Sequence, residues 1–390
     1  MTKAYLDIDL VNRTDASMLY VHITGNRLHN ETNQPLGPMI MKADGQTPHM
    51  LTWNGVNASK LAVDHGIRVG RPGDTKRVRI PRLEGGRIYF SKGRPLTFLV
   101  NEGPALVEPS VMNKTDANYS GHWTFAELTF NMGEVYANVS YVDFLSIPTA
   151  LRLTTESGRV AEVQGIPKGG ITKVAEGLEK LGNPWKKLVV RSPSGSIIRI
   201  LSLNSGYELY PDLFRNFFDE YVDKCWERYE KVDLMVDTQH EDWGVFKGRV
   251  RGGLLRFTKP NKPGFEFNFE KPTTQDVLTC NTGPFAVRQP VDEREKARLA
   301  VGARIAAAIN RVTLLINNKQ PSGEKVGTYY RTQPCNYYSK KVHRVSHESR
   351  GYTFPYDDVT NKVDQSGFVN DSNPKVLTVT VGGFRNPTHL

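Results

Sequence analysis

The sequence predicts a mainly β protein into which a mixed α/β region is inserted. Residues 1 to about 155 alternate apolar and polar side chains between frequent turn signals. Residues 156–334 carry helical spacing between short strand-like runs, and residues 335–390 return to alternation. We therefore expect a β-sandwich or barrel domain built from residues 1–155 with 335–390, interrupted by an α/β domain of residues 156–334.

The N-terminal part begins with a clear strand pattern. Leu6, Ile8 and Leu10 alternate with two aspartates, as expected for a strand with one buried face. Further strands are predicted at residues 19–23, 78–80, 87–90 and 96–100, and at the C-terminal end within 351–359 and 375–384. Short strands at this density are typical of a sandwich or barrel.

The middle of the chain changes to a period of 3.6. Residues 170–182 read as a helix that ends at a glycine, and Asp292 with Glu295 has capping-box spacing at the start of another helix. Residues 210–229 form the strongest helical pattern. Its apolar face consists of Phe214, Phe218, Tyr221, Cys225, Trp226 and Tyr229. We interpret this face as core packing, because such a stripe is the usual buried side of a helix.

Composition narrows the possible partners. The chain has 51 Lys and Arg against 41 Asp and Glu, a net charge of +10, but the basic residues are scattered. Solvated strand faces explain such scatter better than a nucleic-acid site, so we expect no nucleic-acid partner. No apolar run is long enough to span a membrane. The N-terminus goes straight into a predicted strand without a secretory h-region, so we expect either a protein that is not exported by that route or a mature domain given a start Met. The three cysteines make neither a disulfide framework nor a metal-site spacing.

Two acidic residues lie in unusually apolar surroundings. In residues 123–131 a period of two places Glu127 on one face with Trp123, Thr129 and Asn131, and places Ala126, Leu128 and Phe130 on the opposite, core-facing side. Aromatic rings beside short polar groups suit a sugar, although an ordinary solvated sheet face has the same mix. Asp143 follows with Tyr141 and Phe144 close by, and a carboxyl among apolar groups must be paired, bonded or protonated.

A pair of carboxylates is the equipment for glycosidic hydrolysis. One carboxyl protonates the leaving oxygen, and the other activates water or attacks the sugar carbon. Motifs for other chemistries are absent from the sequence: it has no G-x-S-x-G elbow, no H-E-x-x-H and no P-loop.

Residues 87–151 resemble a known enzyme family. The segment RIYFSKGRPLTFLVNEGPALVEPSVMNKTDANYSGHWTFAELTFNMGEVYANVSYVDFLSIPTAL is similar to glycoside hydrolase family 64, the β-1,3-glucanases with a thaumatin-like fold. CNTGPF at 280–285 and YTFPYDDV at 352–359 extend the resemblance over most of the chain. It implies a thaumatin-like β-sandwich or barrel, with a wide cleft between that domain and the α/β insertion.

The resemblance also implies roles for individual residues. Glu127 corresponds to the general acid and Asp143 to the general base of an inverting mechanism. Thr129, Asn131 and Tyr136 match cleft positions, and Tyr136 stands where the family often has Trp. The implied activity is endo-acting hydrolysis of β-1,3-glucan, with release of short oligosaccharides such as the pentamer. Further candidate cleft residues are Asn118, Tyr119, Trp123 and Tyr207, for which packing or surface roles are an equal alternative.

The resemblance carries expectations about cofactors, partners and location. Inverting hydrolysis requires no metal or organic cofactor. The expected partner is β-1,3-glucan, as laminarin, curdlan or cell-wall glucan, bound by a monomer in the extracellular space or cell wall. The alternative in a different class is a glucan-binding protein of the same fold that does not hydrolyse its ligand.

The spacing of the two carboxylates sets a geometric test. If Met132 and Gly133 form a two-residue turn, Glu127 lies opposite Asn138, and Asp143 lies roughly 16 Å further along a flat hairpin at about 3.3 Å per residue. Inverting enzymes separate their carboxyls by roughly 6.5–9.5 Å. The pairing therefore requires a bulge, a bend or a break in the second strand. We also expect a raised pKa for Glu127 and an ionised Asp143.

Overall fold

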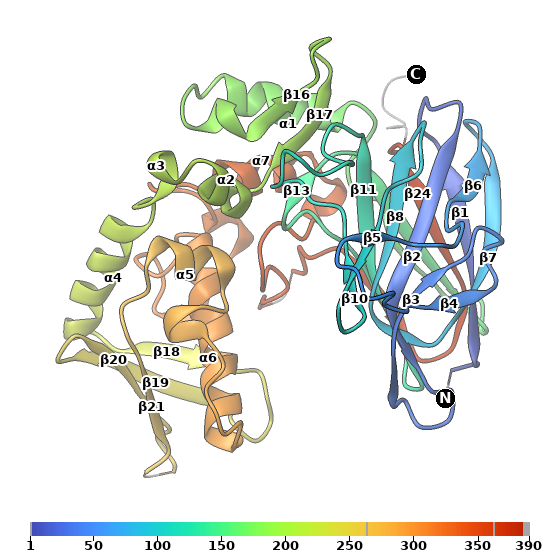
Figure 1. Ribbon diagram of the computed structural model, residues 1–390. Coiled ribbons are helices and arrows are strands. Elements are labelled where there is room, and N and C mark those ends of the chain that lie inside the picture. The colour runs from blue at the N-terminus through green and yellow to red at the C-terminus, as the bar shows by residue number, and fades with distance from the viewer. Residues whose placement is uncertain (1, 263, 362, 385–390) are drawn as a thin grey trace.

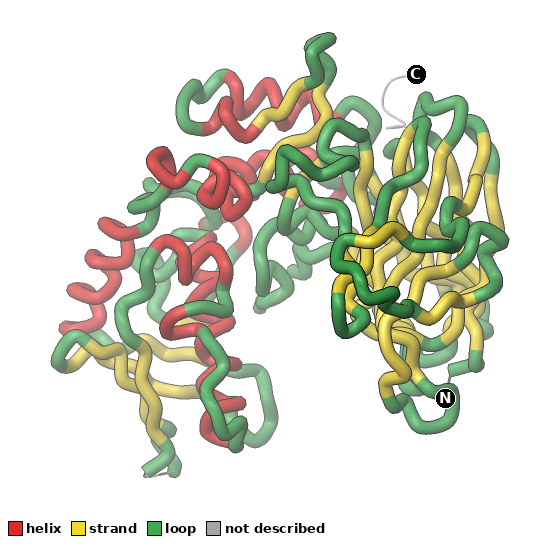
Figure 2. The backbone as a smooth tube through the Cα atoms, in the orientation of Figure 1, coloured by secondary structure: helices red, strands yellow, loops and turns green. Residues whose placement is uncertain are grey.

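The computed structural model describes residues 2–262, 264–361 and 363–384. Figure 1 shows two large sheets on one side of the molecule and a mixed helical and sheet region on the other, and Figure 2 shows the same division by secondary structure. We refer to residues 170–345 as the α/β region. Residues 1, 263, 362 and 385–390, which belong to the predicted domains, lie outside the described residues.

The first large sheet joins the two ends of the chain. Its strand order is β15-β14-β24-β1-β7. The strands are β1 (Tyr5–Asn12), β7 (Thr75–Pro81), β14 (Thr149–Thr155), β15 (Val160–Val163) and β24 (Pro374–Val381). Strand β24 lies between β1 and β14 and runs parallel to β1. The C-terminal strand is therefore a central strand of a sheet that begins at the N-terminus.

The second large sheet contains the predicted acidic strand. Its order is β23-β12-β11-β8-β2-β3-β4, with β6 beside β2. The strands are β2 (Leu19–Leu28), β3 (Pro35–Met41), β4 (Pro48–Met50), β6 (Ile67–Gly70), β8 (Leu83–Lys92), β11 (Trp123–Phe130), β12 (Val135–Val139) and β23 (Phe368–Asp371). Strand β11 lies in the interior of this sheet, between β8 and β12.

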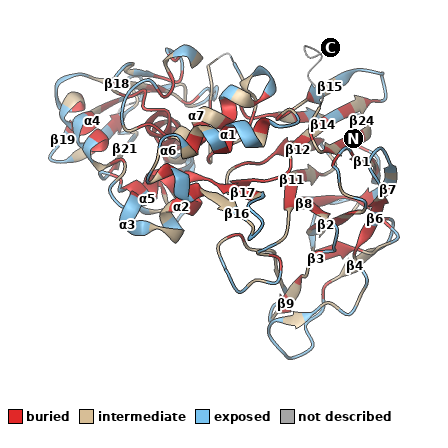
Figure 3. Cartoon of the chain, turned by 90° about the horizontal axis from the view of Figure 1, so that it is seen from above, coloured by how far each residue is buried: buried red, intermediate tan, exposed pale blue. Residues whose placement is uncertain are grey.

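Side-chain alternation explains why the two sheets pack together. Leu6, Ile8 and Leu10 are buried and join one core with residues of the second sheet, as the alternation predicts. On the outer face of β1, Asp7 pairs with Arg79 and Asp9 pairs with Arg77 across to β7. This part of the basic charge is thus a solvated strand face. Figure 3 shows the burial concentrated on the strands of both sheets.

Two further sheets have three strands each. One has the order β10-β9-β5 and the other β13-β17-β16. Their strands are β5 (Ser59–Lys60), β9 (Leu99–Asn101), β10 (Ala105–Val107), β13 (Phe144–Leu145), β16 (Val189–Arg191) and β17 (Ile197–Leu201). Strand β9 covers Leu99–Asn101, so only the last two residues of the strand predicted at 96–100 form a strand.

The α/β region holds a five-stranded sheet and the helices. The sheet order is β21-β20-β19-β18-β22, with β18 (Leu234–Asp237), β19 (Val245–Arg251), β20 (Leu254–Thr258), β21 (Glu266–Phe269) and β22 (Lys319–Gln320). The helices are α1 (Gly170–Glu179), α2 (Leu203–Leu209), α3 (Pro211–Phe214), α4 (Asp219–Lys231), α5 (Thr274–Thr279), α6 (Glu293–Asn310) and α7 (Tyr337–Val345). Short 3-10 turns are η1 (Trp185–Leu188), η2 (Gly283–Phe285), η3 (Val326–Thr328) and η4 (His347–Ser349).

The predicted helices are present, and one of them is divided into two. The predicted helix at 210–229 breaks into α3 and α4, and its apolar stripe is buried as core packing. Asp292 caps α6 by accepting a hydrogen bond from the Glu295 N–H, but the Glu295 carboxylate pairs with Arg298 rather than closing a capping box. All three cysteines are buried and free. Among the described residues, no helix is both long and apolar enough to cross a membrane.

The predicted domain boundaries remain predictions. Strand β15 extends the first large sheet beyond residue 155, and α7, which follows residue 334, packs against α1. Elements from both predicted domains therefore pack together near residues 155 and 334.

Candidate active site

Glu127 lies in the middle of the second large sheet. Its cross-strand neighbours are Arg87 on β8 and Asn138 on β12. The Asn138 amide donates a hydrogen bond of 2.9 Å to the Glu127 carboxylate. The turn around Met132 places Glu127 opposite Asn138, which confirms the predicted register. The core-facing prediction for Ala126, Leu128 and Phe130 is also confirmed, since all three are at most 2% exposed.

The chain leaves the hairpin before it reaches Asp143. Strand β12 ends at Val139, and Ser140 forms a parallel bridge with Tyr352. The Tyr141 N–H donates to the Tyr352 carbonyl over 2.7 Å, and the Tyr338 hydroxyl of α7 donates to the Tyr141 carbonyl over 2.7 Å. These contacts pull the chain out of line with β12, so the break that the carboxylate spacing requires is present.

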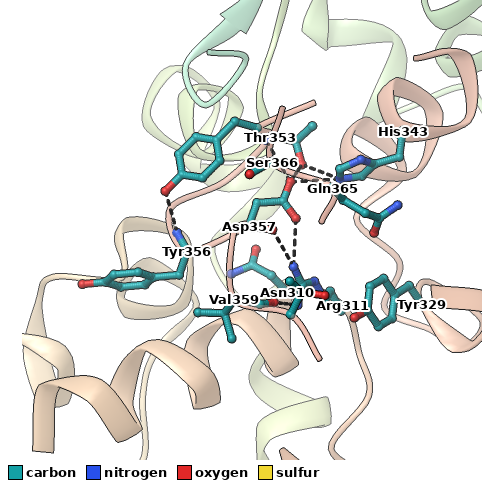
Figure 4. A network of polar contacts seen from close by, with 12 residues as sticks. Asn310, Arg311, Tyr329, His343, Thr353, Tyr356, Asp357, Val359, Gln365 and Ser366 are labelled. Carbon is teal, nitrogen blue, oxygen red and sulfur yellow. Dashed lines mark hydrogen bonds and ion pairs between the residues drawn. The ribbon is translucent and has the colours of Figure 1, made fainter. Parts of the chain in front are cut away.

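A buried ion network supports the segment that captures Tyr141. Asp357, in the YTFPYDDV motif, contacts Arg311 at 3.1 Å and His343 of α7 at 2.9 Å, and Thr353 donates to the same carboxylate. Figure 4 shows Asp357 between these partners. Burial opposes the charge, but His343, Arg311 and the Thr353 N–H hold the pKa of Asp357 below its usual range. The network therefore fixes residues 352–359 from two helices.

Asp143 lies in the bend between β12 and β13, against the α/β region. Its carbonyl accepts hydrogen bonds from the Ser202 N–H, at 3.0 Å, and from the Ser205 hydroxyl, at 2.8 Å. Strand β13 then pairs with β17. Tyr136 and Asp143 are seven residues apart, and on one unbroken strand an odd separation would place them on opposite faces. Because they belong to different elements here, both can face one site.

The Asp143 side chain lines a pocket of about 270 Å³ together with Arg87, Glu108 and Asn204. Burial raises the pKa of Asp143; Arg87 opposes this shift, and the negative charges of Glu127 and Glu108 add to it. The two candidate carboxylates therefore interact electrostatically. The sequence predicts an ionised Asp143, and the bend adds burial, which raises the pKa of this carboxyl above its usual range.

Arg87 occupies the centre of this electrostatic arrangement. It pairs with Glu108 at 2.6 Å, contacts the Tyr89 hydroxyl at 3.3 Å and lies over the Phe125 ring at 4.8 Å. One cation therefore stands among three carboxylates, those of Glu108, Glu127 and Asp143. It lowers the cost of keeping negative charge in a half-buried site.

Thr129 and Tyr136 lie directly opposite each other across β11 and β12. The Tyr136 ring stacks on Phe368 of β23 with centroids 5.0 Å apart. Burial, together with the negative charge of Asp358, raises the pKa of Tyr136. The structure thus brings Thr129, Tyr136 and Glu127 onto one face of the sheet.

Two residues predicted to contact the substrate, Asn131 and Asn118, form hydrogen bonds within the protein. The Asn131 side chain accepts hydrogen bonds from the N–H groups of Gly133 and Glu134 and so closes the hairpin turn. Asn118 is 3% exposed, and its amide bonds to both backbone groups of Thr97. For Asn118 the packing alternative therefore describes its contacts.

The remaining aromatic candidates are partly or fully covered. Trp123 is 2% exposed and donates its indole N–H to the Asn118 carbonyl, so it forms the wall of the Asp143 pocket rather than an open stacking surface. Tyr119 is half-buried beneath Arg199. Tyr207 is half-buried against the core.

Comparison with known proteins identifies a family that matches nearly the whole chain. The family model described as Beta-1,3-glucanase matches residues 4–381. The chain belongs to glycoside hydrolase family 64. A glucan endo-1,3-beta-glucosidase from an Arthrobacter species is 30% identical over 309 residues, which are 79% of this chain and 54% of that protein. The chain thus spans about half the length of the curated relatives it matches.

Solved structures of family 64 share the fold. A laminaripentaose-producing beta-1,3-glucanase in complex with laminaritetraose has a TM-score of 0.84 and 27% identity, covering 97% of this chain and 98% of that one. A beta-1,3-glucanase domain from Clostridium beijerinckii has a TM-score of 0.74 and 21% identity over the same shares of the two chains. The mostly β architecture with several helices is therefore that of family 64.

Several residues around Asp143 are not among the site residues that the sequence predicts. Arg87, Glu108, Asn204 and Glu208 line its pocket; Arg87 comes from β8, Glu108 from the loop after β10, and Asn204 and Glu208 from α2. Among them only Arg87 begins a predicted strand, at residues 87–90, and in the structure that strand pairs with β11. The others are recognisable only once the fold brings α2 to the sheet.

Proposed function

We propose that this protein hydrolyses β-1,3-glucan by internal cleavage with inversion, using Glu127 as general acid and Asp143 as general base. One observation carries the proposal. The chain bends between Val139 and Phe144, which takes Asp143 off the line of β12 and into electrostatic reach of Glu127. A flat hairpin would leave the two groups too far apart for one glycosidic bond.

The proposed step requires only these carboxyls and water. Glu127 gives its proton to the glycosidic oxygen as the bond from that oxygen to the anomeric carbon breaks. Water attacks the anomeric carbon from the opposite face, and Asp143 takes the proton that the water loses. The raised pKa of Asp143 suits this role, because a base is most effective when its pKa approaches the working pH.

The relatives support the substrate class. The similar structure with 27% identity is a laminaripentaose-producing enzyme bound to laminaritetraose. We accordingly propose β-1,3-glucans such as laminarin, curdlan or cell-wall glucan as substrates, and short laminari-oligosaccharides as products. A thaumatin-like β domain facing the α/β region across a wide cleft, a monomeric state and an extracellular or cell-wall location belong to the same proposal.

Along the cleft, Thr129 and Tyr136 are the proposed contacts beyond Glu127. Their side chains are half-buried rather than fully covered. Tyr136 offers a smaller ring than the Trp frequent in the family, and its stacking on Phe368 widens the aromatic surface. Apolar sugar faces pack on such rings, while a hydroxyl such as that of Thr129 bonds to the sugar hydroxyls.

The test compares wild type with Glu127→Gln and Asp143→Asn on laminarin, with Glu156→Gln at an exposed carboxylate as control. Each active-site change should lower kcat by about 10²- to 10⁴-fold, while the control keeps full activity. Proton NMR of fresh product should show the α-anomer first. Normal hydrolysis by Glu127→Gln, or initial β-anomer, would overturn the mechanism. Sedimentation with curdlan without release of reducing sugar would instead indicate a glucan-binding protein.

A further inference from the structure

The pocket beside Asp143 lies at the N-terminal end of β11, the strand that carries Glu127. On the face of β11 that carries Glu127 the order is Trp123, Phe125, Glu127, Thr129, and the first two are buried. Trp123 and Phe125 line the pocket, whereas Thr129 does not. The pocket and the Tyr136 platform are therefore on opposite sides of Glu127.

The wall contributed by the α/β region carries polar groups whose bonding capacity is unfilled. Asn204 and Glu208 are one turn apart on α2 and both line the pocket. The Asn204 amide oxygen is covered by protein and has no hydrogen-bond partner among the described residues. Glu208 is exposed and forms no ion pair within the described part of the chain. The buried Asn204 oxygen lies in the wall of a pocket, where a polar ligand could donate the hydrogen bond that the protein does not supply.

The remaining lining decides the chemistry of the occupant. Tyr89, Trp123, Phe125 and Phe144 supply aromatic surface, which favours the apolar face of a sugar ring. Arg87 is already paired with Glu108, and Asp143 and Glu208 add negative charge. An anion is thus disfavoured, whereas a neutral ligand with many hydroxyl groups meets both donors and acceptors.

We propose that this pocket is a glucosyl subsite on the side of the scissile bond away from Tyr136, and that Asn204 and Glu208 bind the hydroxyls of the unit in it. The proposal rests on the hydrolytic function proposed above and names residues that determine how the chain is placed. A volume of about 270 Å³ is at the lower end of small-ligand sites, which suits one sugar unit rather than a long segment.

Helix α2 thereby serves the reaction in two ways. Its Ser205 hydroxyl holds the backbone of Asp143, and its Asn204 and Glu208 side chains meet the substrate. The base and the sugar unit next to it are located by the same short helix, so the α/β region is part of the active site rather than a separate cover.

The experiment uses Asn204→Ala, Glu208→Gln and the double variant of the full chain. The matched control is Asp212→Asn, an exposed carboxylate on the neighbouring helix α3, whose side chain is 92% exposed. Laminarihexaose labelled at its reducing end is the substrate, and the positions of the cleaved bonds are read by mass spectrometry. Each single change should lower kcat/KM by about three- to tenfold and shift the distribution of cleaved bonds, while the control changes neither.

A binding measurement separates a substrate contact from a structural effect. In the inactive Glu127→Gln background, laminaribiose binding is measured by calorimetry with and without Asn204→Ala and Glu208→Gln. Weaker binding with unchanged thermal unfolding supports the subsite. An unchanged cleavage pattern and unchanged binding would overturn it while leaving the hydrolytic function intact. Absence of hydrolysis by wild type would instead overturn the proposed function itself.

Discussion

The Ser205 hydroxyl donates a hydrogen bond of 2.8 Å to the carbonyl oxygen of Asp143, and so ties the proposed base to a helix 62 residues further along the chain. The Ser202 N–H donates to the same carbonyl. Since Asp143 stands in a bend and not in a strand, these bonds to α2 and the bridge of Ser140 to Tyr352 determine where its side chain points.

Ser205→Ala should therefore lower activity more than it lowers stability. Loss of one buried hydrogen bond costs about 0.5–1.5 kcal/mol of unfolding free energy, but a small displacement of the base should reduce kcat roughly tenfold or more. Thr238→Ala is the matched control, because the hydroxyl of this 2% exposed residue also donates to a backbone carbonyl, that of Gly244, in the turn between β18 and β19. Equal loss of kcat in both variants would show that Ser205 has no positioning role.

The pH dependence of activity should change when the charge of Arg87 is removed, because Arg87 affects the pKa of Asp143. Arg87 lowers the pKa of Asp143, while burial and two carboxylates raise it. The base must be deprotonated, so activity is lost as the pH falls through its pKa. Arg87→Met removes the cation and frees Glu108, and both effects raise the pKa of Asp143 further.

The acidic limb of the kcat/KM profile should consequently move to higher pH in Arg87→Met. The exposed Arg79, paired with Asp7 on the first large sheet, provides the control as Arg79→Gln. A profile that stays in place, or one that moves to lower pH, would mean that Asp143 does not set this limb.

The alternation of side chains along the sequence predicts the position of Glu127 but not that of Asp143. The position of Glu127, the core-facing residues beside it and its register with Asn138 all follow from a period of two and a short turn. The bend that places Asp143 depends on the contact of Ser140 with Tyr352, on the bond of Tyr338 to Tyr141, 197 residues away, and on Ser205. Contacts between distant segments leave no periodic trace in the sequence, which is also why Asn204 and Glu208 were missed.

Replacement of the proposed base should stabilise the fold. The folded state raises the pKa of Asp143, so the charged carboxylate is less favourable in the folded protein than in the unfolded chain. This cost is absent below the unfolded pKa and grows as the pH rises through the folded value. Asp143→Asn carries no such charge.

Urea unfolding of wild type and Asp143→Asn at several pH values tests this. The variant should gain unfolding free energy relative to wild type as the pH rises, and should be the more stable of the two at neutral pH. A variant that is less stable at neutral pH would show that the carboxylate makes a net favourable contribution to the fold.

The buried network around Asp357 should behave in the opposite way. Its pKa is lowered from an ordinary value of 3.8, so its contribution to stability is present above that value and is lost as the pH falls through the lowered folded value. Asp357→Asn removes the buried anion from His343 and one of the two buried carboxylates from Arg311, which keeps Glu324 at 3.5 Å. The change should cost about 3–5 kcal/mol of unfolding free energy at neutral pH. Asp7→Asn, at an exposed ion pair, should cost at most about 1 kcal/mol.

Urea unfolding at neutral pH compares the two variants, and laminarin hydrolysis measured well below the unfolding transition adds a second readout. Because Asp357 fixes the segment that holds Tyr141 through Tyr352, Asp357→Asn should also lower kcat in protein that is still folded, whereas Asp7→Asn should not. Equal stability of the two variants would show that the ion pairs of Asp357 contribute no more than an exposed pair does. Full activity of folded Asp357→Asn would show that the bend before Asp143 is held without this network.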